Sequence, residues 1–355
     1  MSGSPRLDGP WRASAERIAG QDPLDAAPWV LRLPELNHRA DVAGLLTALR
    51  AILPPVERAA QWDPCAAAAA IRDLGMLLAS LRRHGVEPVE ALPAVEAVML
   101  RLGERTDMVP RETVLHYTTW NPAGELQRRF TRDASEAGLI EAVRTAVPWV
   151  EATVELLTRA YALAPDGDEF VGACEAAAGQ LEPLGEVMRF VRARVDPTFF
   201  ATRLRPYFES IRVGGRRYSG AAAAPLGVGL IDHLLWSSDS ADARIREFQA
   251  HLMAYGLPGG RRLYAETLGR PSLVTRLVAA RGRGDTPALA AGVRALDRLF
   301  AFLLAFRSRH TVVAKSAYDE KIRLYSVGSA GYGVDTLLAL LQQTKGARQR
   351  LHAGG

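Results

Sequence analysis

A long amphipathic helix is the strongest constraint in this 355-residue sequence. Apolar residues recur every three or four positions between 288 and 310, the spacing of a helix with one face in a core. Leu296, Leu303 and His310 are seven residues apart, so the histidine continues the buried stripe. An imidazole on such a face is either a hydrogen-bonded core histidine or a ligand, and the helix alone leaves both interpretations open. The stripe consists of Leu289, Val293, Leu296, Phe300, Leu303 and Leu304.

The composition is that of an ordinary globular protein, with 48% hydrophobic and 23% charged residues. The net charge of +5 comes from basic residues, mostly arginines, that are spread along the chain, so we predict no nucleic-acid partner. Cys65 and Cys174 match no metal or redox spacing. The N-terminal residues lack the apolar run of a signal peptide, and no stretch reaches the length of a membrane span. We therefore expect a soluble cytoplasmic protein with no membrane contact.

The apolar periodicity predicts an all-α fold with at most a small β-hairpin near 211–218. Asn37 is predicted to cap a helix over Val42–Leu53, and Pro148 to interrupt or restart the helix over 134–164. The predicted parts are a loose N-terminal arm (1–22), a smaller helical part (23–130), a larger helical part (131–348) and a flexible tail (349–355).

Several common sites are absent from the sequence. It contains no Walker loop, no dinucleotide-binding fingerprint and no Gly-x-Ser-x-Gly elbow. A di-iron carboxylate bundle needs two Glu-x-x-His motifs, and only Glu35 to His38 has this spacing. Asp232 and His233 are adjacent, so on a helix their side chains point about 100° apart and do not face one metal. Non-heme iron is therefore only a minor alternative.

Two features near His310 in the sequence are compatible with a bound ligand. Arg307 stands one helical turn before it, where a cation can pair with a carboxylate near a histidine-bound ligand. The turn Gly328-Ser329-Ala330-Gly331 offers backbone N–H groups with little steric bulk, which suits the close approach of a flat or anionic ligand.

Four motifs carry a resemblance to a known family. They are Phe200-x-x-x-Leu-Arg-x-Tyr207, Arg217-Tyr-Ser-Gly220, Arg307-x-x-His310 and Val327-Gly-Ser-Ala-Gly-Tyr332. Their order and spacing resemble those of the heme-dependent indoleamine and tryptophan 2,3-dioxygenase superfamily. Within it, the chain is most similar to the monodechloroaminopyrrolnitrin synthase branch, from about Asp22 to Arg348. The resemblance implies a large helical bundle of the indoleamine 2,3-dioxygenase type, with heme in residues 131–348.

The resemblance also implies roles for individual residues. His310 matches the proximal ligand of heme iron, which leaves the sixth position open for dioxygen. Arg205 matches the arginine that binds the carboxylate of the amino-acid substrate, a task suited to a bidentate guanidinium. Phe200 matches the aromatic residue that stacks on the indole. Further implied site residues are Arg307 at a heme propionate, Ser329 and Gly328 near the substrate amino group and a propionate, and Tyr318 in the pocket. Ser329 and Tyr318 are the candidate catalytic residues.

The sequence departs from the dioxygenases in one segment. Where they carry Gly-Gly-Ser-Ala-Gly, this chain has four alanines, Ala221 to Ala224, followed by Pro225. Ala222 and Ala223 are therefore predicted to form a small apolar wall over the heme, without a distal serine. No distal histidine and arginine pair is evident, which disfavours peroxidase chemistry.

The implied function is a heme b enzyme that activates dioxygen on tryptophan or a substituted, for example chlorinated, tryptophan. Its product would be a rearranged or oxygenated indole in secondary-metabolite biosynthesis, and an electron donor is a further candidate partner. One alternative is ordinary tryptophan 2,3-dioxygenation to N-formylkynurenine. Others are a heme-binding protein without catalysis and a helical scaffold without a cofactor. Without the resemblance, the residue patterns favour a core or surface role for each of these site residues.

Overall fold

The computed structural model describes residues 11, 14–221, 226–317 and 334–353, and for residues 226, 309–317, 334 and 335 only the backbone. The predicted all-α fold is confirmed, since two short strands are the only sheet in this described part of the chain. The N-terminal helices are α2 (Ala15–Gly20), α3 (Ala27–Val30), α4 (Leu33–His38), α5 (Val42–Ile52), α6 (Val56–Gln61), α7 (Pro64–Arg83), α8 (Pro88–Ala91), α9 (Ala94–Thr106) and α10 (Val114–Tyr117), followed by the 3₁₀ turn η1 (Gly124–Leu126).

From residue 134 onward, the described part of the chain contains the longest helices and two short π-helical turns, η2 and η4. Its elements are α11 (Ala134–Ala162), α12 (Asp168–Leu181), α13 (Leu184–Arg194), α14 (Pro197–Phe199), η2 (Phe200–Leu204), η3 (Arg205–Phe208), β1 (Ile211–Val213), β2 (Arg216–Tyr218), α15 (Leu226–Asp232), η4 (His233–Ser237), α16 (Ala243–Met253), α17 (Pro258–Thr267), α18 (Leu273–Arg281), α19 (Pro287–Ala317) and α20 (Val334–Ala353).

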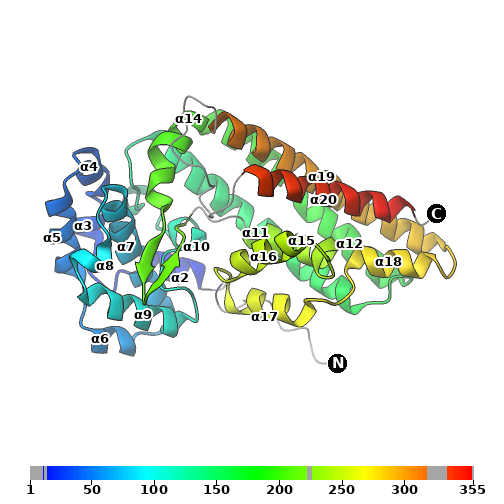
Figure 1. Cartoon of the computed structure of the whole chain (residues 1–355), viewed down its shortest axis with the longest axis horizontal. Helices are drawn as coiled ribbons and strands as arrows, with labels where there is room; N and C mark the ends of the chain where they lie inside the picture. The colour runs from blue at the N-terminus through cyan, green and yellow to red at the C-terminus, as the bar shows by residue number, and fades with distance from the viewer. Residues whose placement is uncertain (1–10, 12–13, 222–225, 318–333, 354–355) are drawn as a thin grey trace.

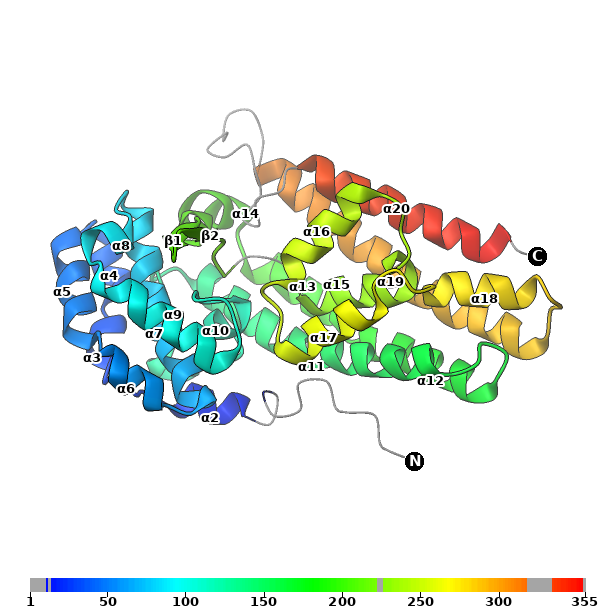
Figure 2. The same cartoon turned by 60° about the horizontal axis from the view of Figure 1, so that its bottom comes forward.

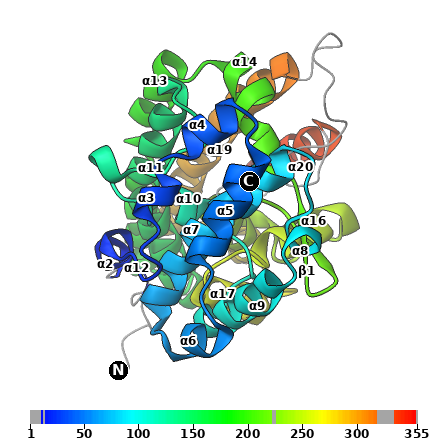
Figure 3. The same cartoon turned by 90° about the vertical axis from the view of Figure 1, so that its left-hand side faces the viewer.

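The elements form an elongated molecule with a distinct body at each end (Figure 1). Helices α2 to α10 make one end, where α7 contacts α5, α9, α2 and α10 and lies near the centre of the end-on view (Figure 3). At the other end α11, α12, α19 and α20 run along the long axis, each in contact with the next (Figure 2). The chain thus places its longest helices side by side, as helices with wide apolar stripes require.

Each end has its own hydrophobic core. The N-terminal core contains Leu45, Leu74 and Leu102, and the C-terminal core contains Leu296, Phe300 and Leu303 of the stripe predicted on α19. Most of the buried hydrophobic residues of 199–221, among them Phe199, Leu204, Tyr207 and Phe208, belong to the N-terminal core. This segment therefore crosses the predicted boundary at residue 130 and lies on the first body.

The hairpin predicted near 211–218 is confirmed. Strands β1 and β2 pair antiparallel, with Ile211 opposite Tyr218 and Val213 opposite Arg216. Gly214 and Gly215 both have positive φ, at 57° and 74°, so the two-residue turn uses the conformational freedom that glycine supplies. The turn chemistry was readable from the sequence because it depends only on local residues.

The described residues of the predicted arm and of the predicted tail are more ordered than predicted. The predicted loose arm contains α2, whose Ile18 is fully buried, and Arg72 of α7 donates to the carbonyl oxygens of Ile18 and Gln21. The predicted tail belongs to α20, which continues to Ala353 and buries Leu351. Apolar residues in otherwise polar segments fold here because the rest of the chain supplies a surface for them.

Two local predictions were wrong. Asn37 does not cap a helix, because it lies inside α4 and its side-chain amide donates to Ser80 and to the carbonyl oxygen of Phe130. The N-cap of α5 is Asp41, whose carboxylate accepts from the backbone N–H of Gly44 at 2.8 Å. Pro148 does not interrupt α11, which is continuous over 29 residues and is held by contacts with α12, α13 and α15. The packing of α11 against these helices outweighs the loss of the backbone hydrogen bond that Pro148 cannot donate.

One described helix, α7, is long and apolar enough to cross a membrane by length and composition. However, 89% of its apolar window is buried inside the protein, and it occupies the centre of the N-terminal core. This is the pattern of a core helix in a soluble protein.

The cysteine thiols are predicted to be unreactive in the folded protein. Both are buried, and burial raises the pKa of Cys174 to about 12, so almost no reactive thiolate forms at neutral pH. We expect native protein to react at least about tenfold more slowly with a disulfide reagent such as DTNB than protein in denaturant. Fast labelling of native protein at the rate of a free thiol would contradict this burial.

Candidate functional site

The segment from α14 to η3 carries the two predicted substrate residues that the structure describes. Asp196 caps α14 by accepting from the backbone N–H of Thr198 at 2.9 Å, and Pro197 occupies the first turn. The following π turn ends when the backbone N–H of Arg205 donates to the carbonyl oxygen of Phe200. Phe200 and Arg205 are therefore one wide turn apart, a geometry that π turns often provide at functional sites.

Arg205 is a buried cation and Phe200 is a half-buried aromatic residue. Only 8% of Arg205 is exposed, whereas the side chain of Arg203, two residues earlier, is 61% exposed and lies over the ring of Phe199. Phe200 packs against the N-terminal core. The backbone thus places the predicted pair one π turn apart, with Arg205 buried and Phe200 half-buried.

Arg307 lies in a buried polar cluster that joins three elements. Its guanidinium forms an ion pair with Asp232, at the end of α15, and donates to the hydroxyl of Thr344 in α20 at 2.9 Å. Asp232 also accepts from the indole N–H of Trp236 at 2.8 Å. Burial raises the pKa of Asp232, and the neighbouring Arg307 opposes that rise. The cluster fixes α19 to α15 and α20 one turn before His310.

Sequence reasoning missed the role of Asp232. It considered this residue only as one half of an Asp-His metal pair, whereas in the structure its partner is 75 residues away. No local pattern could have signalled this contact, because the two residues meet only when α15 and α19 pack together. The predicted contact of Arg307 with a heme propionate stays a prediction.

His310 lies in α19, and the structure describes its backbone. Helix α19 contacts α14, and the C-terminal end of α19 lies beside α14 in all three views (Figure 1). Because α14 leads into the segment of Arg205 on the N-terminal core, while α19 belongs to the C-terminal core, the two meet at the boundary between the cores. Such boundaries are common positions for ligand sites.

Five predicted site residues lie outside the described residues, so nothing in the structure bears on them. They are Ala222, Ala223, Tyr318, Gly328 and Ser329.

A buried arginine, Arg111, stabilises the motif Arg217-Tyr-Ser-Gly220, and no sequence pattern predicts this role. Arg111 donates to the carbonyl oxygens of Glu209 and Tyr218, the residues that flank the hairpin, at 2.8 and 3.1 Å. A Cβ on Gly220 would lie 2.7 Å from the Cα of Phe208 and 2.9 Å from Arg111 Nη2. Glycine is therefore required there because two backbone segments and a guanidinium converge.

His233 is a buried neutral histidine on the π turn η4. Its Nε2 lies 2.8 Å from the hydroxyl of Thr267, which itself donates to the carbonyl oxygen of Leu263. The hydroxyl must therefore accept, so Nε2 carries the proton, and Nδ1 has no hydrogen-bond partner among the described residues. Burial lowers the pKa of His233 to about 4.

This pKa predicts acid sensitivity. In the unfolded chain His233 becomes protonated below its ordinary pKa of 6.5, whereas in the folded chain it stays neutral until about pH 4. The free energy of unfolding therefore decreases as the pH falls from 6.5 to about 4. We expect this residue to contribute about 1 kcal/mol per pH unit to the loss. Urea unfolding of wild type and His233→Gln at pH 7, 6 and 5 measures this contribution. If the free energy of unfolding depends on pH equally in both proteins, His233 does not have the lowered pKa.

The histidines differ sharply in their environments. The sequence has seven, and His310 is the one whose side chain the structure does not describe. Of the others, His38 is exposed, His84 and His352 contact Asn37 and Asp297, and His251 packs against the ring of Tyr255. His116 accepts from the backbone N–H of Thr113, and burial lowers its pKa to about 3.

Metal ligation by several side chains has no support in the described residues. Within these ranges no three His, Cys, Asp or Glu side chains come together where they could hold an ion.

Comparison with known proteins identifies the family. The family described as monodechloroaminopyrrolnitrin synthase PrnB matches residues 14–353, nearly the whole chain. The match includes both cores and every motif on which the resemblance in the sequence rested. The chain therefore belongs to the monodechloroaminopyrrolnitrin synthase family, whose members are enzymes of pyrrolnitrin biosynthesis that act on a tryptophan-derived substrate.

Proposed function

We propose that this protein is a cytoplasmic heme b enzyme that activates dioxygen on tryptophan or a substituted tryptophan and rearranges or oxygenates the indole. The observation that carries the proposal is the contact of α14 with α19. It brings the segment of a buried arginine, Arg205, to the helix that carries His310, at the boundary of the two cores.

The chemistry of the available residues fits heme. Each histidine with a described side chain except His38 already has a hydrogen-bond or ring partner in the protein, and His38 is on the surface. His310 is therefore the histidine that we assign to the iron. Bound heme would supply an iron centre with one open position for dioxygen.

The chain's own residues would then hold the substrate. Arg205 would bind the substrate carboxylate through both arms of its guanidinium, and Phe200, one π turn away, would pack on the indole. The buried position of Arg205 excludes water from this ion pair, which strengthens it. Arg307, held by Asp232 and Thr344, would keep α19 in a fixed position against α15 and α20.

Arg205 offers a test of the substrate site. We expect Arg205→Lys to weaken tryptophan binding by roughly 10- to 100-fold, because a lysine cannot make the paired hydrogen bonds of a guanidinium. Titration of the Soret band of heme-loaded protein with tryptophan measures the affinity. The exposed Arg203→Lys variant is the matched control, and unchanged affinity in Arg205→Lys would remove this residue from the substrate site. Full amino-acid affinity in Arg205→Ala would favour the non-catalytic heme protein instead.

Product analysis separates the two enzymatic alternatives. Ferrous heme-loaded protein is given L-tryptophan and then air, without and with an electron donor, and the products are identified by mass spectrometry. Catalytic formation of N-formylkynurenine would establish ordinary dioxygenation and overturn the proposed rearrangement. A product that retains a rearranged indole-derived ring would support it.

A further inference from the structure

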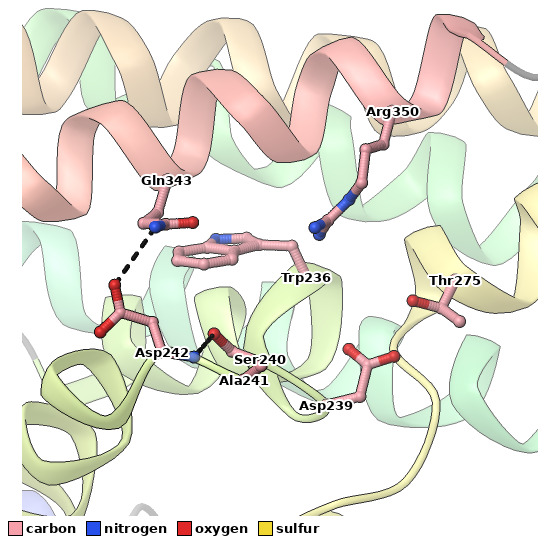
Figure 4. Close-up of a pocket in the computed structure, with 8 residues that line it drawn as sticks. All are labelled: Trp236, Asp239, Ser240, Ala241, Asp242, Thr275, Gln343 and Arg350. Carbon is pink, nitrogen blue, oxygen red and sulfur yellow. Dashed lines mark hydrogen bonds between the residues drawn. The ribbon is translucent and has the colours of Figure 1, made fainter.

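A cleft of about 410 Å³ lies between α20 and the loop that joins η4 to α16. It is distinct from the site proposed above, which is built from α14 and the C-terminal end of α19. Arg350 and Gln343 of α20 form one wall, and Asp239 and Ser240 of the loop form the opposite wall (Figure 4). Trp236 lies between the two walls.

The two walls carry opposite charges that do not meet. The guanidinium of Arg350 and the carboxylate of Asp239 both point into the space between α20 and the loop (Figure 4). Neither side chain has an ion pair or hydrogen bond with the described residues, whereas the nearby Asp242 accepts from Gln343 and Arg244. A molecule with both a carboxylate and an ammonium group would complete the arrangement, because each charge would gain a partner at once.

The cleft is built on a rigid base. Trp236 is 1% exposed, and its indole N–H is fixed by Asp232, which in turn pairs with Arg307. Thr344, the residue after Gln343, closes the same cluster by accepting from Arg307. The walls are thus held apart by buried bonds before any ligand arrives, which lowers the entropic cost of binding.

We propose that this cleft binds a neutral α-amino acid, with its carboxylate on Arg350 and its ammonium group on Asp239. The hydroxyl of Thr275 points toward the same space and adds a polar contact (Figure 4). Six of the eight lining residues have polar or charged side chains, so recognition rests on the two charged groups of the ligand rather than on a large apolar side chain. The proposal does not depend on heme.

The test uses the full-length protein without added heme and three matched probes in saturation-transfer NMR. L-alanine has both charges, alaninamide lacks the carboxylate and propionate lacks the ammonium group. We expect L-alanine to bind at least about tenfold more tightly than either analogue. Arg350→Ala should abolish the advantage over alaninamide, and Asp239→Asn should abolish the advantage over propionate.

The controls separate this cleft from other sites. Arg294→Ala removes an exposed arginine of α19 outside the cleft and should leave L-alanine binding unchanged. Arg205→Ala should also leave it unchanged, because that arginine belongs to the other site. Binding of L-alanine that is lost in Arg205→Ala but retained in both cleft variants, or no binding to wild type, would overturn the proposal. Circular dichroism verifies that the cleft variants fold.

Discussion

Heme-supplied His310→Ala protein is expected to lack the Soret band of a histidine-ligated heme. Removing the iron ligand should reduce heme affinity by more than the roughly 10- to 100-fold that loss of a ligand's hydrogen-bond partner typically costs. Absorption spectra of ferric and ferrous protein, wild type and variant, measure the effect. Free imidazole added to the variant should restore part of the band, because it can occupy the space that the side chain leaves.

The matched control is His38→Ala, which removes an exposed histidine of the other body and should bind heme as wild type does. Failure of the wild-type protein to take up heme would refute the proposed function. His310 would then be interpreted as a core histidine of α19. A His310→Ala variant with the wild-type spectrum would instead assign the iron to another ligand.

Asp232→Ala is expected to destabilise the protein by about 3–5 kcal/mol, because it leaves the guanidinium of Arg307 buried without its counter-ion. The indole N–H of Trp236 loses its acceptor in the same variant. Urea unfolding at pH 7 measures the loss. A destabilisation of less than about 1 kcal/mol would show that the cluster does not hold α19.

The double variant Asp232→Leu, Arg307→Met separates the ion pair from simple packing. Replacing both charged partners by apolar residues should recover much of the stability, since no buried charge is then left unpaired. Glu104→Ala is the control, because its ion pair with Arg101 is exposed on both sides and its loss should change stability by less than about 1 kcal/mol.

A milder variant of Asp232 separates the effect of its charge from that of its shape. Asp232 contacts Trp236 of the cleft and Arg307 of α19, and a milder Asp232→Asn variant keeps the shape of the side chain but removes its charge. The difference in stability between wild type and Asp232→Asn reports the contribution of the charge. The difference between Asp232→Asn and Asp232→Ala reports the contribution of the acceptor and the packing, because asparagine still offers an acceptor to the indole.

Much of the fold could be predicted from the sequence because helices and turns depend on residues that are close together in the chain. The apolar stripe of Leu296, Phe300 and Leu303 predicts α19 and its buried face, and these residues are fully buried. The Gly214-Gly215 turn predicts the hairpin, because positive φ at both positions is a property of those two residues. The motifs around Arg205 and His310 likewise carried enough order to predict the family, which the comparison confirms.

Tertiary structure decided what depends on contacts between distant segments. The ion pair of Asp232 with Arg307 forms across 75 residues, and the placement of residues 199–221 on the first core follows from packing rather than local pattern. Pro148 stays inside a helix, and Ile18 and Leu351 are buried, because neighbouring helices supply the surfaces. Local residues specify which elements form, but burial energy and charge pairing between elements fix where they meet.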